Sequence, residues 1–293
     1  MEFSSPDAFL AHVLSTFRPY LNRLVLVGGF AVRLYELHPR ASQPTIRVLR
    51  TFDADLATAN DRIPVAGESL ARLAEAGGFR LDFRGDLTPP VIKFVPKDAV
   101  EPSGVDQYTI EFLSPLIGAP ASRSGRVAAT SVIQDGVTAQ RLRYLDLLLD
   151  MPWSVSLARL PGIPEESHTI VVSLPHPGLF IVQKILIAKE PNRLDKRPKD
   201  MAYIYHVVSL FRRELNSLAE DVRDRMAANP TWRRWLGRFK QLASSLFAGP
   251  VAPGVTEAHS VLQAEMAGSG LEVPSPQMIH AGVSLFLESF CVR

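Results

Sequence analysis

A short apolar strand that runs into two glycines and then into a helix is the feature that most constrains how this chain folds. Residues 23–27 (RLVLV) have the character of a buried strand, and Gly28-Gly29 separates them from the helical pattern FAVRLYEL. Strand and helix patterns continue to alternate after it: strands are predicted in VLRTFDADLAT, VIKFV and YTIEFL, and a helix in GESLARLAEAGG. This order of elements predicts a mixed sheet with helices packed on it.

The second half of the chain is mainly helical in pattern. We predict an amphipathic helix over residues 139–150, a strand over 168–174, and helices from residue 178 to about residue 247. The sequence therefore predicts an α+β fold in two domains, an α/β domain at residues 1–160 and a mainly helical domain at residues 161–293.

Composition excludes several classes of protein. The 293 residues are 46% hydrophobic and their formal net charge is only +2, which excludes a mainly disordered chain. A single cysteine, Cys291, excludes an intrachain disulfide and a cysteine-rich metal site. No apolar run reaches the ~18 residues of a membrane span, and the N-terminus carries acids where a signal peptide needs a basic start. We expect a soluble, cytoplasmic protein with no membrane partner.

Positive charge is concentrated in one segment. Residues 176–240 contain 14 Lys and Arg against 7 Asp and Glu, a net charge of +7. Such a block can attract nucleic acid or nucleotide phosphate, and a solvated helical face is the alternative. Within it, Trp232 and Trp235 could stack bases beside Arg233 and Arg234, although a packed amphipathic helix is the favoured interpretation.

Two aspartates, Asp53 and Asp55, alternate with apolar residues in the predicted strand RTFDADL. Alternation places both carboxylates on one face, about 7 Å apart, where they repel each other unless a cation lies between them. Hard divalent ions such as Mg²⁺ prefer oxygen ligands of this kind. The alternative is a solvent-facing edge strand with two acids.

The D-x-D motif is accompanied by two further features. The glycines Gly28 and Gly29 would let a phosphate approach the backbone at a helix N-terminus, or they form an ordinary tight turn. Glu111 lies in the otherwise apolar strand YTIEFL, where an unpaired acid is costly. It is therefore either a third carboxylate of the site or one half of a buried salt bridge.

Lys184 lies in the almost wholly apolar stretch 179–188. A lysine in such surroundings must reach an anion, for which a triphosphate would serve, or extend to water. Asp200, soon after Pro198, either favours the start of its helix or has a catalytic role. We predict that Lys184 faces the cleft that holds Asp53 and Asp55, with Asp200 close enough to orient it.

Together these motifs give the chain a family resemblance over roughly residues 20–210. The order strand, Gly-Gly, helix, then a strand with D-x-D, then a strand with one acid resembles the DNA polymerase β-like nucleotidyltransferase superfamily. Arg50-Thr51 before the D-x-D, Lys184 in LFIVQKILIAK, and Lys199-Asp200 in KRPKD are similar to bacterial nucleotidyltransferase-fold proteins related to abortive-infection (AbiE-type) toxins. The chain departs from many relatives in having Glu111 in place of Asp, and Gly-Gly in place of Gly-Ser.

The resemblance implies transfer of a nucleoside monophosphate from an NTP to an acceptor, with two Mg²⁺ (or Mn²⁺) ions and a helical domain that completes the cleft. It implies metal ligands and catalytic groups among the acids and Lys184, and nucleotide contacts from the glycines and the basic motifs. The catalytic set is Asp53, Asp55, Glu111, Lys184 and Asp200; the metal set is Asp53, Asp55 and Glu111; and the nucleotide-binding set is Gly28, Gly29, Arg50, Thr51, Lys184 and Lys199.

The acceptor and partners stay open at this stage. RNA, in particular tRNA, is favoured by the basic segment 176–240, with a small molecule or a protein hydroxyl as alternatives, and a toxin-like protein implies a cognate antitoxin. The alternative function is a nucleotidyltransferase-fold module that binds a nucleotide or a partner without catalysis. The intact D-x-D argues against that alternative, because a decayed site should lose its costly carboxylate pair first.

Overall fold

The computed structural model describes residues 3–46, 49–59, 62–84, 90–98, 107–117, 129–268 and 270–291, and it divides the chain into two compact units. Unit 1 consists of Met1–Leu37 and Arg50–Pro175, and unit 2 consists of His38–Leu49 and His176–Arg293. The sequence placed a boundary at residue 160. Residues 153–174 supply two strands to the sheet of unit 1, and the domain bounds 1–160 and 161–293 stay a prediction.

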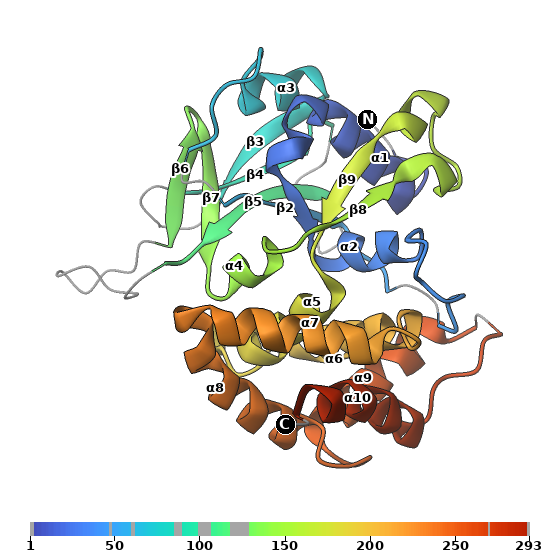
Figure 1. Cartoon of the computed structure of the whole chain (residues 1–293). Helices are drawn as coiled ribbons and strands as arrows, with labels where there is room; N and C mark the ends of the chain where they lie inside the picture. Colours follow the sequence, from blue (N-terminus) through green and yellow to red (C-terminus); the bar gives the residue numbers. More distant parts are fainter. Residues whose placement is uncertain are drawn as a thin grey trace. The chain divides into compact units, whose positions relative to one another are not determined.

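Unit 1 is built on one mixed sheet (Figure 1), to which the described residues contribute nine strands. Its main order is β3-β4-β5-β2-β1-β9-β8, and β7 pairs with both β5 and β6. Strand β2 is antiparallel to β1 and parallel to β5, and β4 is antiparallel to β5. The strands are β1 Val25–Val27, β2 Asp53–Ala57, β3 Phe79–Arg84, β4 Val91–Pro96, β5 Thr109–Pro115, β6 Thr130–Gln134, β7 Val137–Leu142, β8 Trp153–Ser156 and β9 Val171–Leu174.

Helices and aromatic side chains pack on this sheet. Ring–ring contacts join Phe17, Phe94 and Phe112 into an aromatic cluster of the core. The buried Tyr35 hydroxyl donates to the carbonyl oxygen of Pro175 at 2.8 Å, which ties the end of α2 to the segment after β9. The helices of unit 1 are α1 Pro6–Thr16, α2 Gly28–Tyr35, α3 Leu70–Ala76 and α4 Leu145–Leu148.

Unit 2 is helical, and most of its helices begin at or next to a proline, the residue that best tolerates the first helical turn. Its first segment, residues 38–49, is held by the amide of Ser42, which donates to the carbonyl of Leu210 at 2.7 Å. The helices are α5 Pro177–Ile187, α6 Arg197–Leu210, α7 Leu215–Ala228, α8 Pro230–Leu246, α9 Pro253–Met266 and α10 Pro276–Cys291.

The structure confirms the predicted α+β class, a mixed sheet with flanking helices followed by a helical region. The predicted helix over residues 139–150 is wrong in its first half. Val137–Leu142 is strand β7, because an Asp-Gly turn at residues 135–136 returns the chain from β6 as a hairpin, and only the short α4 follows. None of the helices in the described ranges is long and apolar enough to cross a membrane.

Candidate functional site

Strand β2 carries the two aspartates on one face of the sheet. Ala54 and Leu56 are fully buried on the opposite face, whereas Asp53 and Asp55 are partly exposed. The carboxylate of Asp53 accepts a hydrogen bond of 2.6 Å from the hydroxyl of Thr109 on β5. The alternation predicted for this strand is therefore present, and β2 is a central strand, not an edge strand.

A row of charged residues crosses the sheet at Asp55. In the strand register, Asp55 on β2 lies beside Glu111 on β5, and Glu111 lies beside Lys93 on β4. Lys93 and Glu111 form an ion pair, in which the lysine side chain is 23% exposed and the glutamate side chain 12%. Glu111 therefore lies beside Asp55 in the sheet and belongs to a largely buried salt bridge, one of its two predicted interpretations; its role as a third carboxylate of the site stays a prediction.

Gly28 is required at its position for two reasons. Its φ of +71° lies in the left-handed region that side chains disfavour. A Cβ atom added there would lie 2.3 Å from Oδ2 of Asp55, so the carboxylate occupies the space that a side chain would need. Gly28 also begins α2, so Asp55 lies at the positive end of a helix dipole.

The donor chemistry of this face suits a hard divalent cation, because it consists of carboxylate oxygens. Among the residues that the structure describes, however, no group of three or more His, Cys, Asp or Glu side chains is placed to hold one metal ion. Asp53, Asp55 and Glu111 thus do not converge on one point, and Glu111 is directed to Lys93. The two aspartates are the pair whose position and chemistry fit a cation.

Lys184 and Asp200 meet in unit 2. They lie on α5 and α6, and the lysine Nζ donates to Oδ1 of Asp200 at 2.5 Å. Both residues are buried, 5% and 4% exposed, so the alternative in which Lys184 extends to water is wrong. Arg193 donates to the other carboxylate oxygen at 3.2 Å. Two cations therefore share one buried carboxylate.

The ring of Tyr203 on α6 lies next to two of the predicted lysines. The Nζ atoms of Lys184 and Lys199 are 6.0 Å and 5.9 Å from its ring centroid, and Lys184 is also 5.3 Å from the ring of Phe180. Cations at such distances are attracted by the ring face. The structure therefore gathers Lys184, Lys199 and Asp200 into one basic cluster around an aromatic ring.

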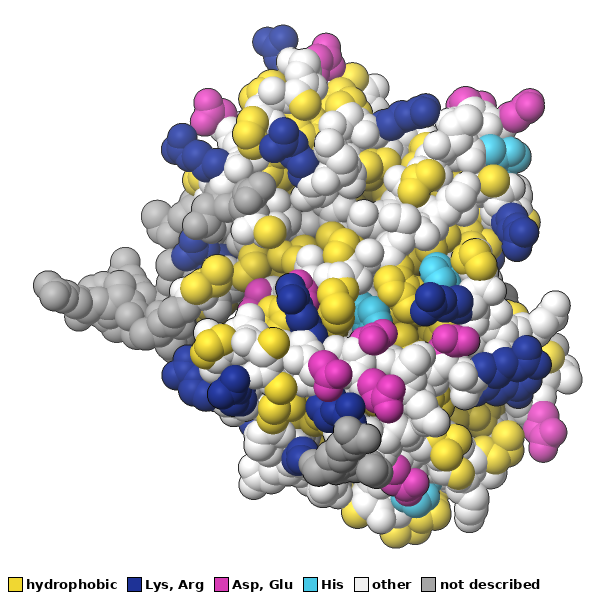
Figure 2. Space-filling view, in the orientation of Figure 1, with side chains coloured by type: hydrophobic (Ala, Val, Ile, Leu, Met, Phe, Trp, Pro, Cys, Tyr) yellow, Lys and Arg dark blue, Asp and Glu magenta, His cyan; other side chains and the backbone are white. Residues whose placement is uncertain are grey.

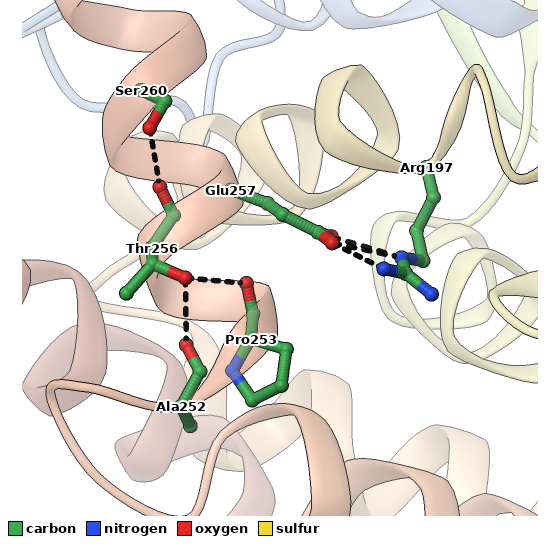
Figure 3. Close-up of polar contacts among 6 residues, drawn as sticks. All are labelled: Arg197, Ala252, Pro253, Thr256, Glu257 and Ser260. Carbon is green, nitrogen blue, oxygen red and sulfur yellow. Dashed lines mark hydrogen bonds and ion pairs between the residues drawn. The ribbon is translucent and has the colours of Figure 1, made fainter.

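The first turn of α6, which carries Lys199 and Asp200, is attached to α9 by a bidentate ion pair (Figure 3). Nε of Arg197 lies 3.1 and 3.0 Å from the two carboxylate oxygens of Glu257, and the guanidinium makes a further contact through Nη2. Hydrogen bonding to Glu257 raises the pKa of Arg197, against the opposing effect of burial. This contact fixes the position of the turn from outside the cluster.

The remaining residues of the predicted nucleotide-binding set differ in burial. Gly29 and Thr51 are buried, and Arg50 is exposed just before β2. The aspartate pair belongs to unit 1, whereas Lys184 and Asp200 belong to unit 2. That Lys184 faces the aspartates stays a prediction, as do the metal-binding and nucleotide-binding roles.

Sequence reasoning missed three residues of these clusters. Lys93 was detectable, because a single charge in the apolar strand VIKFV is the same signal that identified Glu111 in YTIEFL. Thr109 and Arg193 had no comparable signal. Their contacts depend on strand register and on the turn between α5 and α6.

The basic segment has a packed helix, α8, at its C-terminal end. On α8, Trp232 is 6% exposed and its ring stacks on that of Trp235 at 6.4 Å, in agreement with the packed amphipathic helix that the sequence favoured. The guanidinium of Arg233 donates to the carbonyl of Ala227 at 2.7 and 2.9 Å and so satisfies the end of α7. Of the two arginines predicted to bind RNA, Arg233 therefore also has a structural role at the end of α7.

A comparison with protein families identifies the family of this chain. A family model described as "Nucleotidyltransferase" matches residues 10–227, a range that contains the aspartate pair, Glu111, Lys184 and Asp200. No curated protein and no solved structure matches this chain. The match does not extend to a specific relationship with abortive-infection toxins, which stays a prediction.

Proposed function

This chain belongs to the nucleotidyltransferase family, and on that premise we propose that it transfers a nucleoside monophosphate from an NTP to an acceptor with Mg²⁺ or Mn²⁺ at Asp53 and Asp55. The observation that carries the proposal is the placement of these two carboxylates on one face of a central strand, with Asp55 against Gly28 at the start of α2. A bound divalent cation would neutralise charge on the attacking and leaving oxygens.

Residues of the chain would hold these groups in place. The hydroxyl of Thr109 fixes one carboxylate oxygen of Asp53, which leaves its other oxygen for a cation. Gly28 lets Asp55 lie close to the backbone, and the first amides of α2 are a suitable place for phosphate oxygens. Glu111 already pairs with Lys93, so we assign the cation to the two aspartates.

The basic cluster of unit 2 suits the other charged part of the substrate. Lys184 and Arg193 supply two positive charges against the single charge of Asp200, and Lys199 adds a third cation near Tyr203. An excess of positive charge is favourable for a triphosphate, and Lys184, the buried member of the three, is the most shielded from water. We propose that Lys184 contacts the triphosphate while Asp200 orients its ammonium group.

RNA is the acceptor that the surface of unit 2 favours. Helix α8 has four basic residues and no acid, and Arg234 and Lys240 are exposed on it. Figure 2 shows Lys and Arg side chains gathered over the end of α7 and the start of α8. A basic surface of this kind attracts the phosphates of RNA. A cognate antitoxin, by contrast, is a proposal that rests on the toxin-like resemblance alone.

The test is incubation of the protein with each NTP labelled at the α-phosphate, Mg²⁺ or Mn²⁺, and total RNA. We expect label in the RNA fraction, and none with Asp53→Asn. Label in the protein or small-molecule fraction would show that the acceptor is a protein or a small molecule and not RNA, and the proposal of nucleotidyl transfer would stand. No label in any fraction, with binding of NTP retained, would instead support the alternative of a binding module without catalysis.

Salt dependence separates an RNA acceptor from a small one. RNA binding should weaken steeply with added salt, because each phosphate contact releases counterions. Charge reversal at Arg234 and Lys240 should weaken RNA binding and leave NTP binding unchanged. Arg233 is unsuitable for this test because it also supports the end of α7. Binding that does not change between low and high salt would contradict the RNA proposal.

A further inference from the structure

Lys93 is a cation at the edge of the aspartate site, in a position that the family match does not explain. It stands on β4 directly beside Glu111, and Glu111 stands directly beside Asp55. Residues opposite each other on neighbouring strands share a face and lie about 5 Å apart. Lys93 therefore lies two strands across the sheet from Asp55, the aspartate whose carboxylate lies against Gly28.

The ion pair determines where the carboxylate of Glu111 points. Its partner contact is with Nζ of Lys93, and the low exposure of both side chains, 23% and 12%, limits screening by water. On the far side of Lys93, Asp82 of β3 is its register partner. Lys93 thus stands between two acids, of which Glu111 is the one next to the aspartate pair.

The charges of the site follow from this arrangement. Asp53, Asp55 and Glu111 lie on two adjacent strands. Without Lys93, repulsion among these three carboxylates would favour a cation that all three share. With Lys93 in place, Glu111 is neutralised and does not converge with the aspartates, in agreement with the lack of a three-ligand group among the described residues.

We propose that Lys93 is a positioning residue that holds Glu111 out of the cation site, so that the nucleotide-free protein presents only Asp53 and Asp55 to a divalent ion. The inference rests on the proposed function, because it presumes that the aspartates bind the cation. The inference adds Lys93 to the residues of the proposed site. It implies that Lys93, through its ion pair with Glu111, determines how tightly the nucleotide-free protein binds a divalent cation.

The test measures Mn²⁺ binding to the full chain without NTP, by the loss of the free Mn²⁺ paramagnetic resonance signal. Lys93→Met should tighten binding by about tenfold or more, because a nearby like charge is lost and Glu111 is released. Lys93→Arg keeps the charge and should bind as the wild type does. The double variant Lys93→Met/Glu111→Gln should return to wild-type affinity.

Each result decides the proposal. It is overturned if Lys93→Met binds Mn²⁺ no more tightly than Lys93→Arg, or if the tighter binding persists when Glu111 is also replaced. Circular dichroism checks the fold, and Lys93→Gln replaces the methionine variant if that variant does not fold.

Asp53→Asn and Asp55→Asn, each combined with Lys93→Met, separate this inference from the proposed function. If Mn²⁺ binding survives both combinations, the assignment of the cation to the aspartates fails. If the aspartate variants abolish binding but Lys93→Met has no effect, only the role of Lys93 fails.

Discussion

The acidic face of unit 1 and the basic cluster of unit 2 are built from the same kind of contact, an ion pair, but charges of opposite sign are in the majority in the two clusters. In unit 1, three acids lie on two neighbouring strands and Lys93 pairs with one of them, Glu111, so that acids are in the majority. In unit 2, Asp200 pairs with two cations, and the excess charge is positive. The first cluster therefore suits a metal ion and the second suits phosphate.

The two clusters also differ in how they are shielded. The aspartates are partly exposed on a sheet face, whereas Lys184 and Asp200 are nearly inaccessible between helices. Exposed carboxylates can bind and release an ion at little cost to the fold. A buried pair is part of the core, and removal of one partner leaves the other charged and unsolvated. Function and stability should therefore separate in unit 1 and be coupled in unit 2.

The largest expected effect concerns the aspartates. Asp53→Asn or Asp55→Asn should reduce nucleotidyl transfer by about 10³-fold or more, because a charge that holds the cation is lost. The free energy of unfolding should change little, since repulsion between the acids is relieved and asparagine still accepts from Thr109. Label transfer and urea unfolding measure the two quantities. Asp135→Asn, at an exposed turn of the same unit, is the control, and full activity in either site variant would contradict the assignment.

The second effect tests the coupling in unit 2. Lys184→Met should lower transfer by about 10²-fold, the scale of one lost preorganised charge. It should also lower the free energy of unfolding by about 3 kcal/mol, because Asp200 keeps only Arg193. Urea unfolding and label transfer again report the result.

The double variant Lys184→Met/Asp200→Asn sharpens this result. It should recover most of the lost stability without recovering activity, because the unpaired buried charge is gone but the cation is still missing. Lys189→Met, at an exposed lysine just after α5, should change neither quantity. Recovery of activity in the double variant would show that Lys184 acts only through the fold.

A smaller effect is expected at Gly28. Gly28→Ala and Gly136→Ala both place a side chain at positive φ, which costs roughly 1–2 kcal/mol of stability. Only the Cβ at residue 28 collides with Asp55, whereas nothing lies within 4 Å of the one at residue 136. Transfer should therefore fall by about tenfold or more in Gly28→Ala alone, because the carboxylate is displaced. Equal activity in the two variants would show that the contact with Asp55 has no consequence.

The smallest effect compares two ion pairs of unit 2 that differ in burial. A double-mutant cycle on Arg197 and Glu257, whose side chains are 26% and 20% exposed, should give a coupling energy of about 0.5–1 kcal/mol. The same cycle on Lys184 and Asp200 should give about 2 kcal/mol or more. Equal coupling energies would contradict the distinction between the buried cluster and its more exposed anchor.

Local patterns located most of the elements that position these clusters. The strand before Gly28, the helix after it, and the strands of Asp53 and Glu111 were all predicted within a few residues of their bounds. Residues 139–142 of strand β7 were mistaken for the start of a helix, since the stretch AQRLRYLDLLLD at residues 139–150 has helical spacing. The pairing of β7 with β5 and β6 decides the strand, and this is a contact between distant segments.

By itself, the sequence predicted which residues carry the chemistry: alternation placed Asp53 and Asp55 on one face, and apolar surroundings indicated that Glu111 and Lys184 are charges in need of partners. Only the tertiary structure decided which residues pair with Glu111 and Lys184. Glu111 pairs with Lys93 through strand register, and Lys184 pairs with Asp200 through the packing of α5 on α6. The physical reason is that periodicity is a property of one segment, whereas an ion pair needs two segments brought together by the fold.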